Sequence, residues 1–309
     1  MGHPRGDIPV TGPRQIWAMS ASPDPTRIAW GRSIPFLLVH LGAVATPFLA
    51  PPTWGLVGLA AGLYALRMFG ITAGYHRYFA HRAFRTGRAF QLVLAVVGAA
   101  SAQKGALWWA AHHRDHHRWS DEPEDLHSPV RQGFLWSHMG WFLATRYDRT
   151  RHERIADFAR FPELRWLDRW HLVPPVALGV GLLAAGGLPA LLWGFFVSTT
   201  LLWHGTFVIN SLAHVVGRRR YETGDESRNS FLLALVTLGE GWHNNHHFFA
   251  STANQGWFWW ELDVSYAVLR ILARLGLVRD LRTPPPHVQF AHLRAAPGRP
   301  AAPATDEAA

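Results

Sequence analysis

The sequence predicts an all-α integral membrane protein. Four transmembrane helices form two hairpins, and a cytoplasmic helical cap holds a histidine-rich two-metal site. Three observations predict this fold class. Four apolar runs approach the length that crosses a bilayer, short proline or glycine turns separate them in pairs, and nine histidines cluster in the polar parts of the 309-residue chain.

The first hairpin is expected over residues 34–70. The run over residues 34–50 carries no charge, a two-proline turn follows, and the run over residues 54–70 is interrupted only by Arg67. Crossing the hydrocarbon core takes roughly 20 apolar residues, with about 17 as the lower limit. Both runs are close to that limit and are predicted to span.

The second hairpin is expected over residues 172–185 and 188–209, with a Gly-Gly turn between them. The last run contains no Asp, Glu, Lys or Arg, whereas its partner is short and carries two prolines. Residues 90–102 are also apolar, but this run is too short for a span and suits a re-entrant or interfacial segment. Two hairpins of near-spanning length are hard to bury in a soluble core, which favours membrane insertion.

The membrane domain is predicted to cover residues 34–280. Residues 1–33 are polar and proline-rich, and residues 281–309 are rich in Pro and Ala, so both ends are predicted to be disordered. Both hairpin turns lack Lys and Arg, while the large loops hold many arginines. The positive-inside rule therefore places both termini and the polar mass in the cytoplasm.

The composition excludes several kinds of site and partner. The chain has no cysteine, which excludes disulfides, thiolate metal sites and an iron–sulfur cluster of its own. The formal charge is +9, and Lys104 is the only lysine among 30 basic residues. Because these residues lie among apolar runs, we expect a membrane surface rich in anionic lipid as the partner, and no nucleic acid.

Nine histidines and one asparagine form four clusters in the polar segments. They are His76 and His81; His113, His116 and His117; Asn210 and His214; and His243, His246 and His247. On a helix, positions i, i+3 and i+4 share one face, so each histidine triple is predicted to present three imidazoles to one point. His76 and His81 are five residues apart and are predicted to straddle a helix end.

The number of histidines points to two metal ions. A zinc ion closes its shell at four ligands, so nine imidazoles suit two ions with four to five ligands each. Imidazole binds Zn, Cu, Fe and Ni, so the ligand type alone leaves the metal open. Five histidines outside the clusters are predicted to be structural or exposed, namely His40, His112, His138, His152 and His171, and the role of His204 stays open.

At these motifs the sequence resembles the membrane-bound fatty acyl desaturases, in particular the bacterial form of the stearoyl-CoA (delta-9) type. The three histidine boxes of that family match HxxxxH over residues 76–81, HxxHH over residues 113–117 and HxxHH over residues 243–247. The additional NSxAH element matches residues 210–214. The resemblance covers residues from about 30 to about 280.

The resemblance implies a specific site and reaction. It implies two iron ions held by the nine histidines, with Asn210 reaching one iron through water. It implies oxygen-dependent removal of two hydrogens, at the delta-9 position, from a long saturated acyl chain. The carrier expected is coenzyme A, with a lipid as the alternative. It also implies a location in the bacterial inner (cell) membrane, and a bend in the acyl tunnel formed by Gln103, Trp109 and Thr206.

This chemistry agrees with what the residues allow. An unactivated methylene has no acidic proton, so an oxidising metal cofactor is needed to cleave its C–H bond. The protein must position the chain and orient the ligand imidazoles through their second nitrogen. The carboxylates near the boxes that are candidates for this task are Asp115, Asp121, Glu122, Asp125 and Glu240.

Reduction of oxygen to water in this reaction needs two electrons from outside. The chain has no cysteine cluster and no dinucleotide fingerprint, so we expect a separate ferredoxin or cytochrome b5-like donor with its reductase. Arg218, Arg219 and Arg220 are candidates for contacts with an acidic donor or with the phosphates of coenzyme A. An equal alternative is that they are a cytoplasmic anchor that follows the positive-inside rule.

Three other functions compete with the desaturase. A histidine-box hydroxylase of fatty acids, alkanes or carotenoids shares the metal core, and its product is an alcohol instead of a double bond. A metal transporter is disfavoured because the clusters lie outside the predicted spans, whereas transport sites lie near the bilayer midplane. A zinc hydrolase is disfavoured because the sequence has no His-Glu-x-x-His motif.

Overall fold

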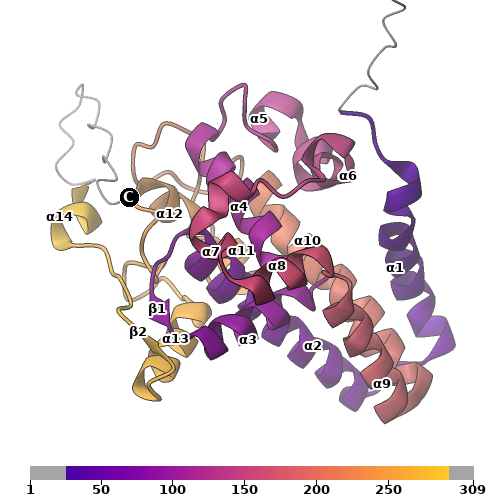
Figure 1. Ribbon diagram of the computed structural model, residues 1–309. Helices are drawn as coiled ribbons and strands as arrows, with labels where there is room; N and C mark the ends of the chain where they lie inside the picture. The colour runs from indigo at the N-terminus through magenta and orange to yellow at the C-terminus, as the bar shows by residue number, and fades with distance from the viewer. Residues whose placement is uncertain (1–25, 292–309) are drawn as a thin grey trace, which may run out of the picture.

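A computed structural model describes residues 26–291 of the chain, and this part is mostly helical (Figure 1). Long apolar helices fill the lower right of the view, and short helices gather above them and to the left. Strand β1 (Arg85–Thr86) pairs antiparallel with β2 (Val278–Arg279). The predicted all-helical character is therefore confirmed, apart from this two-stranded ribbon.

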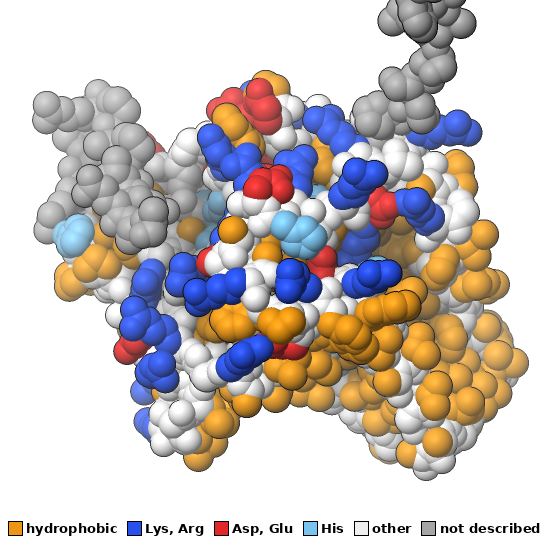
Figure 2. Space-filling view, viewed as in Figure 1, with side chains coloured by type: hydrophobic (Ala, Val, Ile, Leu, Met, Phe, Trp, Pro, Cys, Tyr) orange, Lys and Arg blue, Asp and Glu red, His pale blue; other side chains and the backbone are white. Residues whose placement is uncertain are grey.

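Three helices in the described residues are long and apolar enough to cross a membrane. They are α1 (Trp30–Leu49); α2 (Trp54–Phe69) continuing into the π-helix η1 (Gly70–Ala80); and α9 (Val173–Leu191) continuing through the π-helix η5 (Leu192–Val197) into α10 (Ser198–Ser211). Figure 2 shows the apolar surface of this region at the lower right.

The third long helix reverses its direction at the predicted Gly-Gly turn. Gly186 and Gly187 have non-helical backbone angles, and the φ of Gly187 is +66°, a conformation that glycine adopts without strain. The Leu182 side chain packs against Gly194 on the far side of this turn. In a straight helix these two residues would lie about 18 Å apart, so the chain must fold back between them.

The observed helix ends differ from the predicted ones. Helix α1 begins at Trp30, four residues before the predicted span, and the second long helix continues from residue 70 to Ala80. The continuation was missed because it contains polar residues, which the cap buries completely. Residues 281–291, assigned to a disordered tail, are described and include a short helix; residues 1–25 and 292–309 lie outside the described part.

The remaining helices form the cap and its junction with the long helices. They are α3 (Arg88–Ala99), α4 (Ala106–Trp119), α5 (Pro129–Gln132), η2 (Trp136–Gly140), α6 (Trp141–Leu143), η3 (Thr145–Tyr147), η4 (His152–Ile155), α7 (Ala156–Ala159), α8 (Pro162–Arg169), α11 (Phe231–Val236), α12 (His243–Phe248), α13 (Val264–Arg274) and α14 (Pro286–Gln289). The main buried cluster packs η1, α3, α4 and α8 together and includes Phe79, Leu107 and Leu164. This packing fixes η1 against α4, the two helices that carry the first two histidine boxes.

Candidate metal centre

Nine histidines converge in two adjoining groups, each with one ring nitrogen per residue within 4.8 Å of the others. The first group is His76, His81, His113, His117 and His246, and the second is His116, His214, His243 and His247. The sequence predicted these nine residues. The prediction that each histidine triple faces one point is wrong, because each triple is divided between the two groups.

Helix α4 lies between the two groups, and its geometry explains the division. His113 and His117 are four residues apart, share one side of the helix and belong to the first group. His116 is rotated by about 100° from His117 and belongs to the second. Helix α12 is divided in the same way, but with the two groups exchanged. Its residues four apart, His243 and His247, belong to the second group, and His246 belongs to the first.

The π-helix η1 explains how His76 and His81, five residues apart, can both belong to the first group. The backbone N–H of His81 donates to the carbonyl of His76 at 3.1 Å, an i to i−5 hydrogen bond that widens the last turn. His81 is the C-cap of this helix. The prediction that the two histidines straddle a helix end is confirmed, and the wider turn lets both rings reach the first group.

The distances between ring nitrogens fit a metal ion in each group. His246 Nε2 lies 2.9 Å from both His76 Nε2 and His117 Nε2. One ring nitrogen carries either one proton or one lone pair, so it cannot satisfy two such contacts by hydrogen bonding. Nitrogen ligands about 2.1 Å from a metal ion and at right angles to each other are about 3.0 Å apart, close to the observed spacing.

The second group gives the same indication. His214 Nε2 and His243 Nε2 lie 3.1 Å apart. The buried Nε2 of His247 has no hydrogen-bond partner among the described residues. Buried polar atoms are normally paired, so an orphaned imidazole nitrogen that faces other imidazoles fits the lone pair of a metal ligand. The residues present therefore suit one ion in each group.

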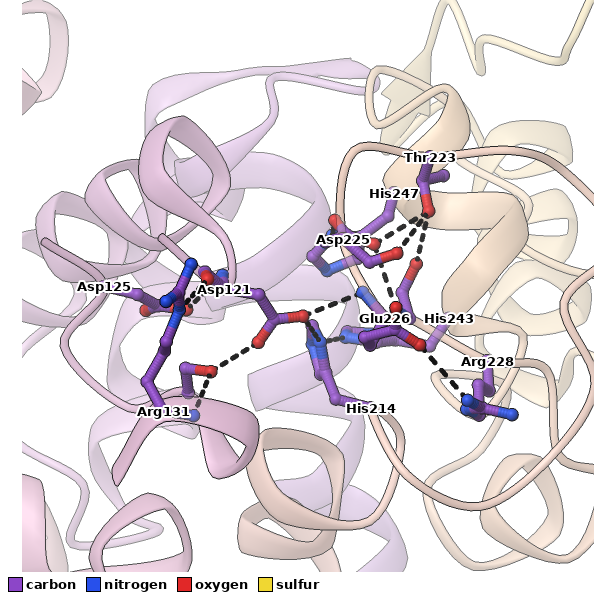
Figure 3. A network of polar contacts seen from close by, with 12 residues as sticks. Asp121, Asp125, Arg131, His214, Thr223, Asp225, Glu226, Arg228, His243 and His247 are labelled. Atoms are coloured by element: carbon purple, nitrogen blue, oxygen red, sulfur yellow. Dashed lines mark hydrogen bonds and ion pairs between the residues drawn. The ribbon is translucent and has the colours of Figure 1, made fainter. Parts of the chain in front are cut away.

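Carboxylates hold the opposite ring nitrogens of four of these histidines. The pairs, from Nδ1 to a carboxylate oxygen, are His76–Glu240 at 2.5 Å, His116–Asp125 at 3.0 Å, His214–Asp121 at 2.9 Å and His247–Asp225 at 2.6 Å. Figure 3 shows Asp121 reaching His214 and Asp225 reaching His247 from two different loops. Such a carboxylate fixes the proton on Nδ1 and leaves the Nε2 lone pair free for a metal ion.

Three of the five carboxylates predicted for this role fill it: Asp121, Asp125 and Glu240. Asp115 instead forms ion pairs with Arg151 and Arg154. No histidine contact of Glu122 occurs among the described residues, and its side chain is exposed. Asp225 was missed because it lies in a polar loop at no motif spacing from His247, its partner.

The electrostatics favour neutral imidazoles at six histidines of the centre. At His116, burial is outweighed by the attraction and hydrogen bond of Asp125, which raise its pKa. Burial, and then repulsion from neighbouring histidines, lowers the pKa of His113, His117, His243 and His246 well below the usual value. Burial opposes ionisation of Asp121, but its hydrogen bond and attraction to His214 lower its pKa to about 2. Neutral histidines beside ionised carboxylates are the protonation states that a metal ion requires.

The fully buried Arg77 joins η1 to the segments around α12. Its guanidinium donates to Glu240 at 3.0 Å, to Asp263 at 3.0 Å and to the carbonyl of Ala253 at 2.7 Å. Glu240 also holds His76, so one carboxylate connects this arginine to the first group. Sequence analysis did not single out Arg77, although it directly follows His76 in the first box.

The two asparagines within the last histidine box are structural. Asn244 Oδ1 accepts hydrogen bonds from the backbone N–H groups of Arg220 and Tyr221, both at 2.7 Å. Asn245 Oδ1 accepts from the side chain of Asn229 at 2.7 Å. These bonds fasten the loop after α10 to α12 and thereby hold the histidines of α12 in place.

The remaining predicted site residues surround the first group and α10. Gln103 donates to Thr206 Oγ1 at 2.9 Å, and the Trp109 ring stacks on His113 with centroids 4.9 Å apart. Asn210 lies near the end of α10, four residues before His214. Its carbonyl accepts a hydrogen bond from Ser137 at 2.6 Å.

A relay of three histidines was not predicted. His40 Nδ1 donates to the carbonyl of Phe36 at 2.8 Å, so its Nε2 accepts from His204 Nε2 at 3.1 Å. His204 Nδ1 lies 2.9 Å from His138 Nε2, and His138 Nδ1 lies 2.9 Å from the Ser211 hydroxyl, which donates to the carbonyl of Phe207. The relay links α1, α10 and η2, and His204 on α10 contacts a histidine from each of the other two helices.

A further buried histidine adjoins the second group and was also missed. His127, His116 and Asp125 form a third set of potential ligands within 4.8 Å of one another. The His127 ring lies 4.3 Å from the ring of His116. As a single histidine at no box spacing, it carries no signal in the sequence.

Comparison with known proteins places this centre in a family. Residues 52–278, which include all nine histidines, match the family model described as fatty acid desaturase. The chain belongs to the fatty acid desaturase family. The resemblance inferred from the histidine boxes is thereby confirmed.

Several curated desaturases are similar to this one over most of their length. The sn-2 palmitoyl-lipid 9-desaturase of Nostoc sp. (strain 36) is 34% identical over 265 residues, which cover 84% of this chain and 92% of that protein. The sn-1 stearoyl-lipid 9-desaturase of Anabaena variabilis is 35% identical over 261 residues, covering 83% and 94%. The acyl-CoA 5-desaturase AL21 of Anemone leveillei is 34% identical over 265 residues, covering 82% and 81%.

Proposed function

We propose that this desaturase removes two hydrogens from adjacent carbons, at the 9-position, of a long saturated fatty acyl chain. Two iron ions held by the nine histidines serve as the cofactor, and O2 is the co-substrate. The observation that carries the proposal is the convergence of nine imidazoles into groups of five and four, four of them oriented by carboxylates. The family match supplies the reaction class.

Each group of histidines has its own part in the proposal. The five imidazoles of the first group would hold one iron and the four of the second group the other, and Asn210 would reach one of the irons through water. When bound, the irons supply the oxidising power that a methylene C–H bond requires. The carboxylates on Nδ1 keep the ligand rings oriented and basic.

The reaction balances with external electrons. The saturated pair of methylenes, O2, two electrons and two protons give one double bond and two waters. The absence of cysteine supports a separate ferredoxin or cytochrome b5-like donor with its reductase. A pocket of about 220 Å³ lined by His81, Arg114, His117 and His247 opens beside both groups and suits the approach of small reactants.

Gln103, Trp109 and Thr206 bend the acyl tunnel in this proposal. The hydrogen bond between Gln103 and Thr206 joins the segment before α4 to α10 across the expected path of the chain. Trp109 stacks on His113 and so lies directly beside the first group. A bend at this place determines which carbons meet the metal centre.

The carrier that we favour is a membrane lipid. Sequence analysis favoured coenzyme A, but two relatives that this chain covers over more than nine-tenths of their length are named for lipid-linked palmitoyl and stearoyl chains. A relative named for acyl-CoA is covered less completely. The names of these two lipid-linked relatives also support the 9-position.

The membrane arrangement in the proposal has four spans and a cytoplasmic centre in the bacterial inner membrane. The reversal at Gly186 and Gly187 supports dividing the third long helix into two spans. Neither hairpin turn carries Lys or Arg, which supports cytoplasmic termini and a cytoplasmic cap.

Lipid analysis tests this function. The chain is expressed, with an electron donor and its reductase, in a host that cannot desaturate, and double bonds are located by mass spectrometry. We expect new monounsaturated acids with the bond at the 9-position. Hydroxylated acids would instead identify the sister hydroxylase reaction. Iron-loaded protein with active donor and no new product would refute the proposal.

A further inference from the structure

We propose that a pocket beside α11 binds the phosphate of an anionic phospholipid headgroup. The pocket, here the Arg218 pocket, has a volume of about 570 Å³. Its lining combines cationic and aromatic side chains, chiefly Arg218, Arg219, Arg220, Phe231, Trp242 and Trp260. It lies outside the two histidine groups, and its function does not depend on the desaturation chemistry.

The three arginines of the pocket differ in their partners. Arg219 pairs with Glu226 at 3.1 Å, and Arg220 pairs with Glu261. The Arg218 side chain is exposed, and no ion pair or side-chain hydrogen bond of it occurs among the described residues. One guanidinium in this pocket therefore keeps its charge and donors available for an anion.

The backbone of Arg218 is held in place. Its N–H donates to the carbonyl of Asn229 at 2.9 Å, and its carbonyl accepts from the N–H of Asn229 at 2.8 Å. Asn229 also bridges to Trp242 on its other side. The backbone of Arg218 is thus held beside the aromatic residues that line the pocket. Less conformational entropy of the chain is therefore lost when an anion binds.

The pocket lies where the cap meets the long apolar helices. Helix α10 ends at Ser211, only seven residues before Arg218. Helix α11, which begins at Phe231 in the pocket wall, is fastened to α2 by a 2.7 Å hydrogen bond from the Tyr64 hydroxyl to the carbonyl of Val236. A site between these helices lies at the level of the bilayer boundary.

The surface around the pocket is apolar enough to lie in lipid. On α11, Phe231 and Leu232 are 53% and 71% exposed, and the nearby Trp259 is 93% exposed. All six side chains of α11 are apolar, and an exposed apolar patch of this kind in a protein with membrane-spanning helices is typical of a surface that contacts lipid. Exposed tryptophans beside it match the aromatic belt at the headgroup level.

These features together select a lipid phosphate over a soluble phosphate. An available guanidinium recognises a phosphate, and the exposed apolar rim recognises acyl chains and glycerol. A soluble carrier such as coenzyme A would leave that rim in water. The headgroup expected is one with a net negative charge, such as phosphatidylglycerol, because the guanidinium of Arg218 has no carboxylate partner among the described residues.

The test measures lipid binding to the purified full chain in detergent. Native mass spectrometry compares dioleoyl phosphatidylglycerol with dioleoyl phosphatidylcholine on the wild type, Arg218→Gln, Arg218→Lys and the control Arg149→Gln, which alters an exposed arginine outside the pocket. We expect phosphatidylglycerol to bind more tightly than phosphatidylcholine. Arg218→Gln should weaken its binding about tenfold, as the loss of a hydrogen bond to a charged group does, with partial recovery in Arg218→Lys and no change in Arg149→Gln.

Three results would overturn the proposal. Equal affinity for the two lipids would show that charge is not recognised, and unchanged binding in Arg218→Gln would show that the anion is held elsewhere. Displacement of phosphatidylglycerol by coenzyme A in the wild type but not in Arg218→Gln would assign the pocket to a soluble carrier. Wild-type metal content in each variant verifies its fold, and because no turnover is measured, the outcome is independent of the proposed reaction.

Discussion

His76 Nε2 and His246 Nε2 lie 2.9 Å apart although 170 residues separate them in the chain. One ring comes from the end of an apolar helix and the other from a short helix of the cap. Their contact is therefore the point at which the membrane part and the cap form one centre. The carboxylate of Glu240 contacts Nδ1 of His76 and also forms an ion pair with Arg77. The junction between the two parts therefore depends on a buried network of charged groups.

Replacing Glu240 by Gln should strongly destabilise the protein. The change leaves the fully buried Arg77 with one carboxylate fewer, and removing one partner of a buried ion pair costs about 3–5 kcal/mol. Thermal unfolding in detergent measures the effect. Glu163→Gln is the control, because it breaks the solvent-exposed pair with Arg88 and should change the unfolding temperature little. Equal effects of the two substitutions would contradict this account of Arg77.

Asp225→Asn should weaken metal binding without unfolding the protein. Asp225 accepts a hydrogen bond from His247 Nδ1, and loss of such a partner lowers metal affinity about 10–100-fold. Competition with a chelator, monitored by metal analysis, gives the affinity. Glu226→Gln alters the neighbouring carboxylate, which pairs with arginines instead of a histidine, and should leave the affinity unchanged. An unchanged affinity in Asp225→Asn would show that this carboxylate does not orient a ligand.

The metal-free protein should lose stability as the pH falls below about 6.5. Burial lowers the pKa of five histidines, namely His81, His113, His117, His243 and His246. In the unfolded chain these groups titrate near 6.5, so below that pH the unfolded state binds more protons and the free energy of unfolding decreases. Thermal unfolding of chelator-treated protein at pH 7.5 and 5.5 checks the sign. A higher unfolding temperature at pH 5.5 would contradict it.

Thr206→Val should relax the choice of double-bond position. Valine keeps the shape of threonine but cannot accept the hydrogen bond from Gln103, which we propose fixes the bend of the tunnel. The expected product is a mixture of positional isomers, detected by locating double bonds in the fatty acids formed. Thr200→Val lies on the same helix, where the threonine hydroxyl has no partner among the described residues, and should keep a single isomer. A single isomer from Thr206→Val would remove this contact from the account of regiochemistry.

The sequence predicted the nine clustered histidines, whereas their grouping required the structure. Spacings of three and four residues identify one helix face, but they do not tell that α4 lies between two groups and divides His113 and His117 from His116. The five-residue spacing of the first box needed a π-helix, which spacing rules for α-helices do not include. The helix boundaries were predicted to within a few residues where the chain is apolar, and less well where burial of polar residues extends the helix.

The partners of the histidines were predictable only in part. Asp125 and Glu240 lie close in sequence to histidine boxes and were among the candidates, but Asp225 reaches His247 through a loop that no motif marks. The relay through His204 likewise joins three segments that are distant in the chain. Such long-range contacts follow from how the helices pack, and a single sequence does not encode that packing in a readable pattern.

Metal analysis of purified protein tests the central claim most directly. The wild type should contain about two irons per chain, since each histidine group suits one ion. His246→Ala in the first group and His243→Ala in the second should each retain about one iron and lose desaturation. A single iron in the wild type, a preference for zinc under iron-replete expression, or loss of both ions in each variant would contradict two separately assembled iron sites.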